Sequence, residues 1–254
     1  MGAGHAHLLL HPGSSIVHRL SPQTKLVAAM LFVLAVVATP REQVWAFALH
    51  AALLMAVAVT ARIPPGLIGR RMLVETPFVI FAVLMPFLAR GERIDVLGLA
   101  VSVDGLWSAW NVLAKATLGV VCSILLAATT ELRELLLGLE RLRMPALIVQ
   151  IMGFMIRYAD VIGDEMRRMR IARESRGFVA RDLRQLPAVA RSAGALFIRT
   201  YERGERVHLA MLSRGYTGQM PKMGAPVAAR SEWLTALALP AAAIAVVIAA
   251  WIQK

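Results

Sequence analysis

Residues 106–129 read LWSAWNVLAKATLGVVCSILLAAT, a run in which Lys115 is the only charged side chain. A helix needs about 20 consecutive apolar residues to cross a hydrocarbon core about 30 Å thick. This run is long enough, and its polar residues Asn111 and Lys115 are isolated among apolar ones. It therefore predicts a transmembrane helix.

The rest of the chain is similarly apolar. Of its 254 residues, 58% are hydrophobic, and the mean hydropathy is +0.63. Soluble domains are roughly 45–50% apolar, so this composition does not favour a large soluble core. Disorder requires low hydrophobicity and is excluded. Further apolar runs cover residues 26–39, 44–60, 72–89 and 233–252. We therefore predict an all-α integral membrane protein with five transmembrane helices, four within residues 1–130 and the fifth within residues 233–254.

Residues 131–232 differ from these runs, because they hold 18 of the 28 basic and 11 of the 16 acidic residues. Their apolar residues recur every three or four positions, which is typical of amphipathic helices. We expect three such helices, over residues 131–142, 145–176 and 187–214. The apolar stripes of the two long helices are Leu147, Ile151, Phe154, Tyr158, Ile162, Met166 and Met169, then Val189, Ala193, Phe197, Tyr201 and His208.

The net charge of +12 indicates how the chain is oriented. On an apolar chain, excess Lys and Arg mark segments that face the cytoplasm and an anionic leaflet. This places residues 131–232 and the N-terminus in the cytoplasm. We predict a multi-pass protein of the cytoplasmic (inner) membrane, with lipid rather than nucleic acid as its charged partner.

A short motif closes each of the two long amphipathic helices. Residues 170–178 read RIARESRGF and residues 208–216 read HLAMLSRGY, which share the pattern Ala-x-x-Ser-Arg-Gly-aromatic. One interpretation is helix capping, with each glycine left-handed and each arginine complementing the helix dipole. Capping explains the glycines, but it does not explain a Ser-Arg pair before them and an aromatic residue after them in both copies.

The other interpretation makes each motif a docking end, formed by Ser175, Arg176 and Gly177 and by Ser213, Arg214 and Gly215. The link between Gly177 and Pro187 is short, so the second helix starts near the end of the first. Antiparallel or crossed packing then sends the two ends to opposite extremes of the pair. Two equivalent ends suit a partner with two equivalent pockets, such as a two-fold symmetric ATPase dimer.

Five spans, cytoplasmic helices before the fifth span and twin Arg-Gly ends resemble the transmembrane (T) component of energy-coupling factor (ECF) transporters. That family's signature is two Ala-Arg-Gly motifs, and Ser175 and Ser213 replace the alanines here. His18–Leu26, HRLSPQTKL, resembles the family's Leu-x-Pro-x-x-Lys-Leu entry to the first span. Residues 153–158, 164–177 and 210–218 are similar to the cobalt branch, the CbiQ proteins.

The resemblance implies a scaffold subunit of an ATP-driven cobalt importer that serves cobalamin biosynthesis. Its partners would be two ATP-binding-cassette subunits, a substrate-binding membrane subunit and optionally a small accessory membrane subunit. The chain itself would have no catalytic residue, metal site or cofactor, because ATP and Mg²⁺ would be bound by the ATPases. The alternatives are a T component for nickel or a vitamin, and a membrane enzyme of unrecognised type with Asp160, Asp164 and Glu165 as its site.

Three common enzyme motifs do not occur in the sequence: the P-loop, His-Glu-x-x-His and Gly-x-Ser-x-Gly. Glu75 and Lys115 lie in apolar runs, where charges are costly, so they are candidates for intramembrane polar contacts, including a direct pair. The histidines at the N-terminus, His5, His7 and His11, are expected to belong to a cytoplasmic tail rather than to a metal site.

Overall fold

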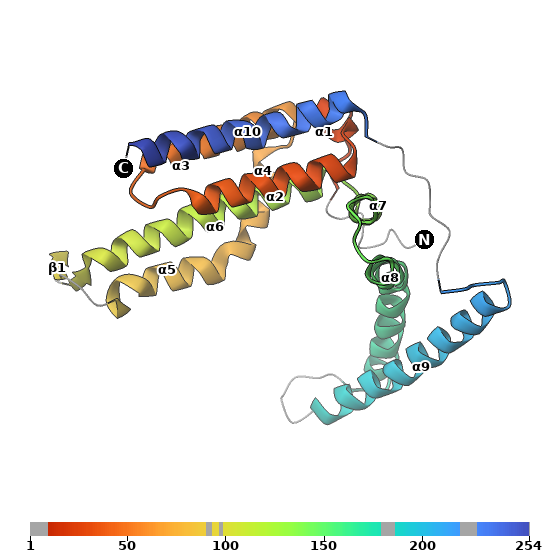
Figure 1. The fold of residues 1–254 in the computed structure, drawn as a ribbon. Coiled ribbons are helices and arrows are strands. Elements are labelled where there is room, and N and C mark those ends of the chain that lie inside the picture. Colours follow the sequence, from red (N-terminus) through yellow and green to blue (C-terminus); the bar gives the residue numbers. More distant parts are fainter. Residues whose placement is uncertain (1–9, 90–92, 97–98, 179–185, 219–227, 254) are drawn as a thin grey trace. The chain divides into compact units, whose positions relative to one another are not determined.

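The computed structural model describes residues 10–89, 93–96, 99–178, 186–218 and 228–253, and these are mainly helical (Figure 1). The chain divides into two units. The apolar unit comprises residues 9–138 and 225–254, and the amphipathic unit comprises residues 139–224. The boundary between residues 138 and 139 lies eight residues after the change of composition at residue 131.

The apolar unit holds the chain's most apolar helices. Its elements are α1 (Ile16–Arg19), α2 (Pro22–Ala38), α3 (Val44–Thr60), α4 (Pro65–Arg71), the 3-10 turn η2 (Met72–Glu75), α5 (Thr76–Leu88), β1 (Arg93–Val96), β2 (Leu99–Ser102), α6 (Val103–Thr129), α7 (Leu132–Arg141, whose last residues pass into the amphipathic unit) and α10 (Arg230–Ile252). Helix α2 packs against both α10 and α6, and α5 packs along α6 (Figure 1).

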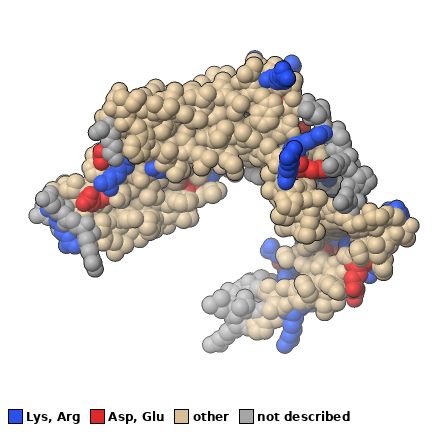
Figure 2. Space-filling model, in the orientation of Figure 1, with Lys and Arg blue, Asp and Glu red and all other residues tan. Residues whose placement is uncertain are grey.

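The core of the apolar unit lies where α2, α3, α6 and α10 meet. Its buried side chains include Phe32 from α2, Leu54 from α3, Leu125 from α6 and Ala243 from α10. Small residues such as Ala243 let the helices approach closely, as is usual in membrane bundles. The face of this unit seen in Figure 2 is mostly uncharged, and its charged side chains gather near the ends. The unit therefore has the surface of a bundle that crosses a bilayer.

The lengths of the apolar helices only partly match the predicted spans. Among the described residues, four continuous helical stretches are long and apolar enough to cross a membrane: residues 65–88, 103–129, 146–174 and 230–252. Helices α2 and α3 are apolar but shorter, at 17 residues each. By length alone the third of our spans begins at Pro65 rather than at residue 72, and residues 146–174 qualify although we place them in the cytoplasm. The set of five spans therefore stays a prediction.

A short antiparallel hairpin is an addition to the all-α prediction. Strands β1 and β2 pair with Arg93 opposite Ser102 and Val96 opposite Leu99. Strands of four residues are too short to show a clear alternating pattern in the sequence. The hairpin joins α5 to α6, and the hydroxyl of Ser102 accepts a hydrogen bond from the Gly105 amide, which caps α6.

The amphipathic unit is built on α8 (Ala146–Glu174) and α9 (Leu186–Leu212), within two residues of the predicted bounds. Contacts between the two helices run antiparallel. Arg173 donates to Ser192 at 3.2 Å, and Arg199 donates to Glu165 at 2.8 Å. Helix α8 has no fully buried residue, so its apolar stripe is only partly covered within the part of the chain that the structure describes.

Candidate functional site

The first Ser-Arg-Gly motif closes α8 with a fully formed C-cap. Gly177 has φ of +75°, a conformation that glycine adopts without the steric penalty of a Cβ atom. The Phe178 amide donates to the Arg173 carbonyl at 3.0 Å, and the Gly177 amide donates to the Glu174 carbonyl at 3.0 Å. These two bonds form a Schellman motif, which satisfies carbonyls at the helix end.

The second motif repeats this geometry at the end of α9. Gly215 has φ of +80°. The Tyr216 amide donates to the Met211 carbonyl at 3.0 Å, and the Gly215 amide donates to the Leu212 carbonyl at 3.0 Å. The capping interpretation therefore holds for both glycines.

The serines and arginines of the two motifs also match. The Ser175 hydroxyl donates to the Ala172 carbonyl at 3.2 Å, and the Ser213 hydroxyl donates to the Ala210 carbonyl at 3.0 Å. Each serine thus closes its own last turn, which orients the backbone of the arginine that follows. The two ends are the same local structure, built twice.

The side chains of Arg176 and Arg214 take no part in the cap. Both residues are exposed, and within the described residues neither guanidinium forms an ion pair. Elsewhere on the same helices, Arg168, Arg170 and Arg199 are each bound to a carboxylate. Each cap therefore presents a free, planar guanidinium fork that can bind carboxylates or carbonyls of another chain.

The two ends lie at opposite extremes of α8. The Tyr216 hydroxyl lies 2.9 Å from Oε1 of Gln150, in the first turns of α8, whereas the first motif directly follows its last turn. At 1.5 Å per residue, 29 residues span about 43 Å. The sequence does not predict a role for Gln150. Its only signal in the sequence is that it interrupts the apolar start of α8.

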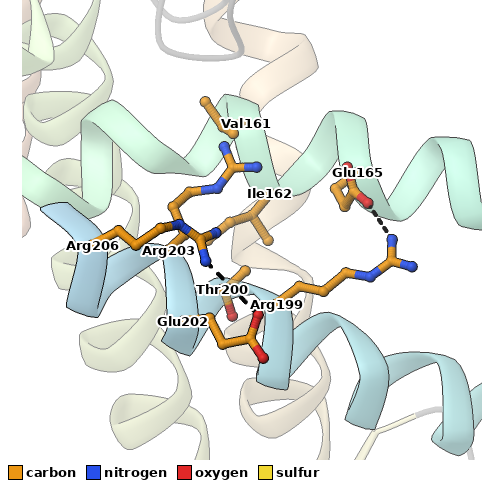
Figure 3. Close-up of a pocket in the computed structure, with 8 residues that line it drawn as sticks. All are labelled: Val161, Ile162, Glu165, Arg199, Thr200, Glu202, Arg203 and Arg206. Carbon is orange, nitrogen blue, oxygen red and sulfur yellow. Dashed lines mark hydrogen bonds and ion pairs between the residues drawn. The ribbon is translucent and has the colours of Figure 1, made fainter.

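Where α8 and α9 cross, polar side chains surround a pocket of about 170 Å³ (Figure 3). Three arginines and two glutamates line it with Val161, Ile162 and Thr200: Arg199, Arg203, Arg206, Glu165 and Glu202. Charges of both signs lie on its α9 wall, where Arg206 is 3.9 Å from Glu202.

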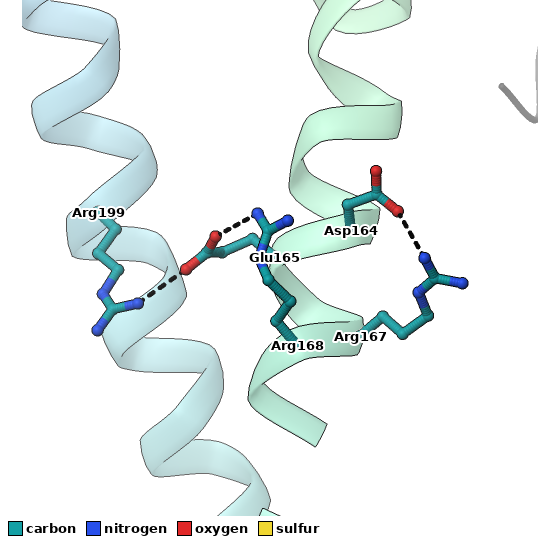
Figure 4. A network of polar contacts seen from close by, with 5 residues as sticks. All are labelled: Asp164, Glu165, Arg167, Arg168 and Arg199. Carbon is teal, nitrogen blue, oxygen red and sulfur yellow. Dashed lines mark hydrogen bonds and ion pairs between the residues drawn. The ribbon is translucent and has the colours of Figure 1, made fainter. Parts of the chain in front are cut away.

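Glu165 forms the ion pair that joins the two helices (Figure 4). Its carboxylate accepts from Arg168 of its own helix at 2.7 Å and from Arg199 of α9 at 2.8 Å. Hydrogen bonds from these two arginines hold the pKa of Glu165 below its ordinary value. A general acid needs a raised pKa, so this arrangement does not favour Glu165 as a general acid. The neighbouring Asp164 is bound to Arg167 at 3.5 Å.

The two intramembrane charges contact different elements rather than each other. Glu75, buried in η2, accepts a hydrogen bond from the Thr117 hydroxyl of α6. Lys115, also on α6, donates to the Val37 carbonyl at the end of α2 at 2.7 Å. Residues two apart on a helix face different directions, so Thr117 and Lys115 meet different neighbours.

Of the N-terminal histidines, His5 and His7 lie outside the described residues. The backbone of His11 donates to the Ala128 carbonyl of α6 at 2.9 Å and accepts from the His18 ring at 3.1 Å. Within the described ranges no three His, Cys, Asp or Glu side chains come together in a way that could hold a metal ion.

Comparisons with known proteins agree with this architecture. Residues 13–223 match the model of the CbiQ family, described as "Cobalt transport protein". The energy-coupling factor transporter transmembrane protein EcfT of Bacillus selenitireducens is 28% identical over 229 residues, which cover 82% of each chain. The cobalt transport protein CbiQ of Rhodobacter capsulatus is 28% identical over 123 residues, 48% of this chain and 50% of the relative. The uncharacterized protein MJ1089 of Methanocaldococcus jannaschii is 32% identical over 130 residues, about half of each chain.

Proposed function

The chain belongs to the CbiQ family, and from that premise we propose that it is the membrane scaffold of an ATP-driven importer of the ECF type. Members of this family are non-catalytic transmembrane subunits of transporters. In our proposal, this chain couples ATP hydrolysis by two partner ATPases to movement of a substrate-binding membrane subunit.

The observation that carries this proposal is the pair of matched helix ends. Arg176 and Arg214 extend from caps with the same hydrogen bonds, at opposite extremes of α8. A stability device would not need a free guanidinium at each end, because the Gly caps already satisfy the carbonyls. Two copies of one recognition element fit two copies, or two homologous copies, of one acceptor groove.

In this mechanism the chain holds and moves its partner subunits and catalyses no reaction itself. ATP and Mg²⁺ are bound by the ATPase subunits, and closure of those subunits moves the two docked ends. Helices α8 and α9 pass the movement to the apolar unit and to the substrate-binding subunit. Exposed apolar side chains along both helices, such as Met155 and Phe197, form the surface for that subunit and the membrane. Substrate is then released to the cytoplasm.

For the substrate we propose Co²⁺. Support comes from the family description, from the relative in Rhodobacter capsulatus named as a cobalt transport protein, and from a relative in Methanocorpusculum labreanum named as a putative fused cobalt transport protein CbiMQ. The EcfT relatives, which align over more of the chain, carry names without a metal, so nickel or a vitamin remains the alternative. ATP-dependent uptake of radioactive Co²⁺, with Ni²⁺ as competitor, distinguishes the metals.

The central test uses the docking arginines. Wild type, Arg176→Ala, Arg214→Ala and the double variant are co-expressed with the candidate ATPases and substrate-binding subunit. Removing one partner of a buried charge pair costs about 2–5 kcal/mol, so each single variant should weaken ATPase co-purification by about 30-fold or more. The double variant should be weaker than either single one, and lysine should replace arginine poorly.

The matched control for these variants is Arg167→Ala. Arg167 is an exposed arginine of α8 whose ion pair lies within its own helix turn. We expect this variant to assemble like wild type. Normal assembly and transport by both Arg176→Ala and Arg214→Ala would leave capping as the whole role of the two motifs.

A second test addresses topology. Single cysteines are placed at Ser175 and Ser231 in a chain with Cys122 replaced. In sealed cells a membrane-impermeant thiol reagent should not label them, and it should do so once the membrane is permeabilised and the cytoplasmic side becomes accessible. Labelling of either site from outside sealed cells would contradict the cytoplasmic placement of residues 131–232. The same result would favour α8 as a membrane span.

A further inference from the structure

The start of α2 buries three consecutive polar residues. Gln23, Thr24 and Lys25 are 8%, 0% and 6% exposed. Lysine is almost never this buried unless its ammonium group is fully paired. The segment Ser21–Leu26, here called the anchor segment, lies within the stretch that resembles the family's Leu-x-Pro-x-x-Lys-Leu pattern. The docking function uses none of its residues.

Lys25 ties the anchor segment to the end of α6. Its ammonium donates to the Thr129 carbonyl at 2.9 Å, to the Thr130 hydroxyl at 3.2 Å and to the His18 carbonyl at 3.1 Å. Three donors thus meet three oxygens. A cation at the carboxyl end of a helix also complements the helix dipole. The junction from α6 to α7 is therefore held by one side chain of α2.

The next helix, α7, lies directly on the same segment. A Cβ atom at Gly138 would lie 2.9 Å from Cδ1 of Leu26, 3.0 Å from the Gln23 nitrogen and 3.1 Å from the Pro22 carbonyl carbon. Only glycine allows α7 to approach α2 this closely. Residue 138 is also the last residue of the apolar unit before the chain continues into the amphipathic unit.

The returning chain is held by the same segment. After the amphipathic unit, the chain re-enters the apolar unit just before α10, and Glu232 lies in the first turn of that helix. The Ser21 hydroxyl donates a hydrogen bond to the Glu232 carboxylate. The chain leaves the apolar unit through α7 and returns to it through α10. Both of these helices therefore contact the six residues of the anchor segment.

We infer that the anchor segment is the joint through which movement of α8 and α9 reaches the membrane helices, with Lys25 as its positioning residue. This rests on the proposed coupling function. A displacement entering through α7 or leaving through α10 acts on α2 and α6 only if these attachments are rigid. Without the Lys25 ammonium, the oxygens of His18, Thr129 and Thr130 lose their hydrogen-bond donor, and the α6–α7 junction is held less rigidly.

The test compares transport with ATP turnover in the complete complex. Lys25→Met keeps the apolar stem of the side chain and removes the ammonium. We expect this variant to co-purify with the ATPases and to hydrolyse ATP, because the docking ends are intact. Uptake per ATP hydrolysed should fall by about tenfold, within the range reported for residues on a coupling route.

Gly138→Ala tests the same joint without changing charge, and it keeps the inference falsifiable if Lys25→Met fails to fold. It should also lower uptake per ATP. The matched control is Gly119→Ala in α6, where a Cβ atom would meet nothing within 4 Å. We expect this control to couple like wild type.

Three outcomes overturn the inference in distinguishable ways. If Lys25→Met and Gly138→Ala keep the wild-type uptake per ATP, the anchor segment is not the joint, and the docking function stands. If hydrolysis and uptake fall in parallel with the amount of folded protein, the role is structural only. If wild type itself does not assemble with the ATPases, the proposed function fails and this inference fails with it.

Discussion

The two units of this protein are stabilised in different ways. In the apolar unit, side chains from α2, α3, α6 and α10 form one buried cluster, with Phe32 fully buried at its centre. In the amphipathic unit, no residue of α8 is buried, and Phe197 of α9 is 69% exposed. The same side-chain type therefore has opposite environments in the two units.

This difference indicates which unit is complete by itself. The apolar unit has its own packed interior and its own buried polar contacts. Polar contacts join α8 and α9 at separated points, including those of Glu165, Ser192 and Gln150, and Leu196 of α9 is a buried apolar side chain. Large exposed apolar side chains on a helix usually mark an interface with protein or membrane. This exposure supports our proposal that the amphipathic unit is completed by its partners.

The largest predicted effect separates the two phenylalanines. Phe32→Ala should destabilise the isolated subunit by about 3–5 kcal/mol, because it leaves a cavity in a packed core. Phe197→Ala should have little effect on the isolated subunit, since its side chain is already exposed. Thermal unfolding of each purified variant in detergent measures this directly. Equal loss of stability in both variants would show that the amphipathic unit has an internal core that the contacts do not reveal.

The reverse effect is expected in the assembled complex. There, Phe197→Ala should weaken co-purification of the substrate-binding membrane subunit, whereas Phe32→Ala should matter only through loss of folded protein. Pull-down at matched amounts of folded scaffold provides the comparison. Unchanged capture of that subunit by Phe197→Ala would remove this face of α9 from the proposed interface.

A smaller effect is predicted at the caps. Gly177→Ala and Gly215→Ala should each destabilise a helix end by about 1–2 kcal/mol, because an L-residue is strained at positive φ. Gly163 and Gly204 are matched controls on α8 and α9, where a Cβ atom would meet nothing within 4 Å. Alanine at these helical positions should stabilise by about 0.5–1 kcal/mol. Hydrogen exchange in the last turns of each helix should therefore become faster in the cap variants and slower in the control variants. The same change in both kinds of variant would contradict the capping geometry.

The sequence allowed prediction of the elements whose cause is local. Apolar runs and helix punctuation located α3 and α9 to within two residues, and the glycines of the twin motifs correctly predicted left-handed caps. The continuous helical stretch that holds the third apolar run begins at Pro65, ahead of the run itself, because its first part, α4, carries the basic residues Arg70 and Arg71.

Contacts between distant segments could not be predicted in the same way. Lys25, for example, looks like a charge that flanks a span, and only the fold reveals that it binds the end of α6. The pairing of Glu75 with Thr117 and the contact of Tyr216 with Gln150 are similar cases. Which residues face each other depends on helix rotation and packing, which one sequence does not specify.

The smallest predicted effect concerns pH at the crossing of α8 and α9. The pKa of Glu165 is lowered from its ordinary value of 4.5, chiefly by the hydrogen bonds from Arg168 and Arg199. A group whose pKa is lower in the folded state stabilises that state above its unfolded pKa, and this contribution is lost as the pH falls through the folded value. The crossing should therefore loosen as the pH is lowered below about 4.5.

Hydrogen exchange of α9 at neutral and acidic pH, with exchange rates corrected for pH, tests this contribution. Glu165→Gln should exchange faster than wild type at neutral pH and should approach wild type in acid, because protonation already removes the wild-type charge. Glu202→Gln is the control, since its ion pair with Arg206 lies within α9 and does not join the helices. If Glu165→Gln and Glu202→Gln show the same small change at neutral pH, the Glu165 ion pairs contribute nothing specific to the crossing. The alignment of the two helices would then depend on the contacts of Ser192 and Gln150 and on partner surfaces, and the contrast between the two units would be sharper still.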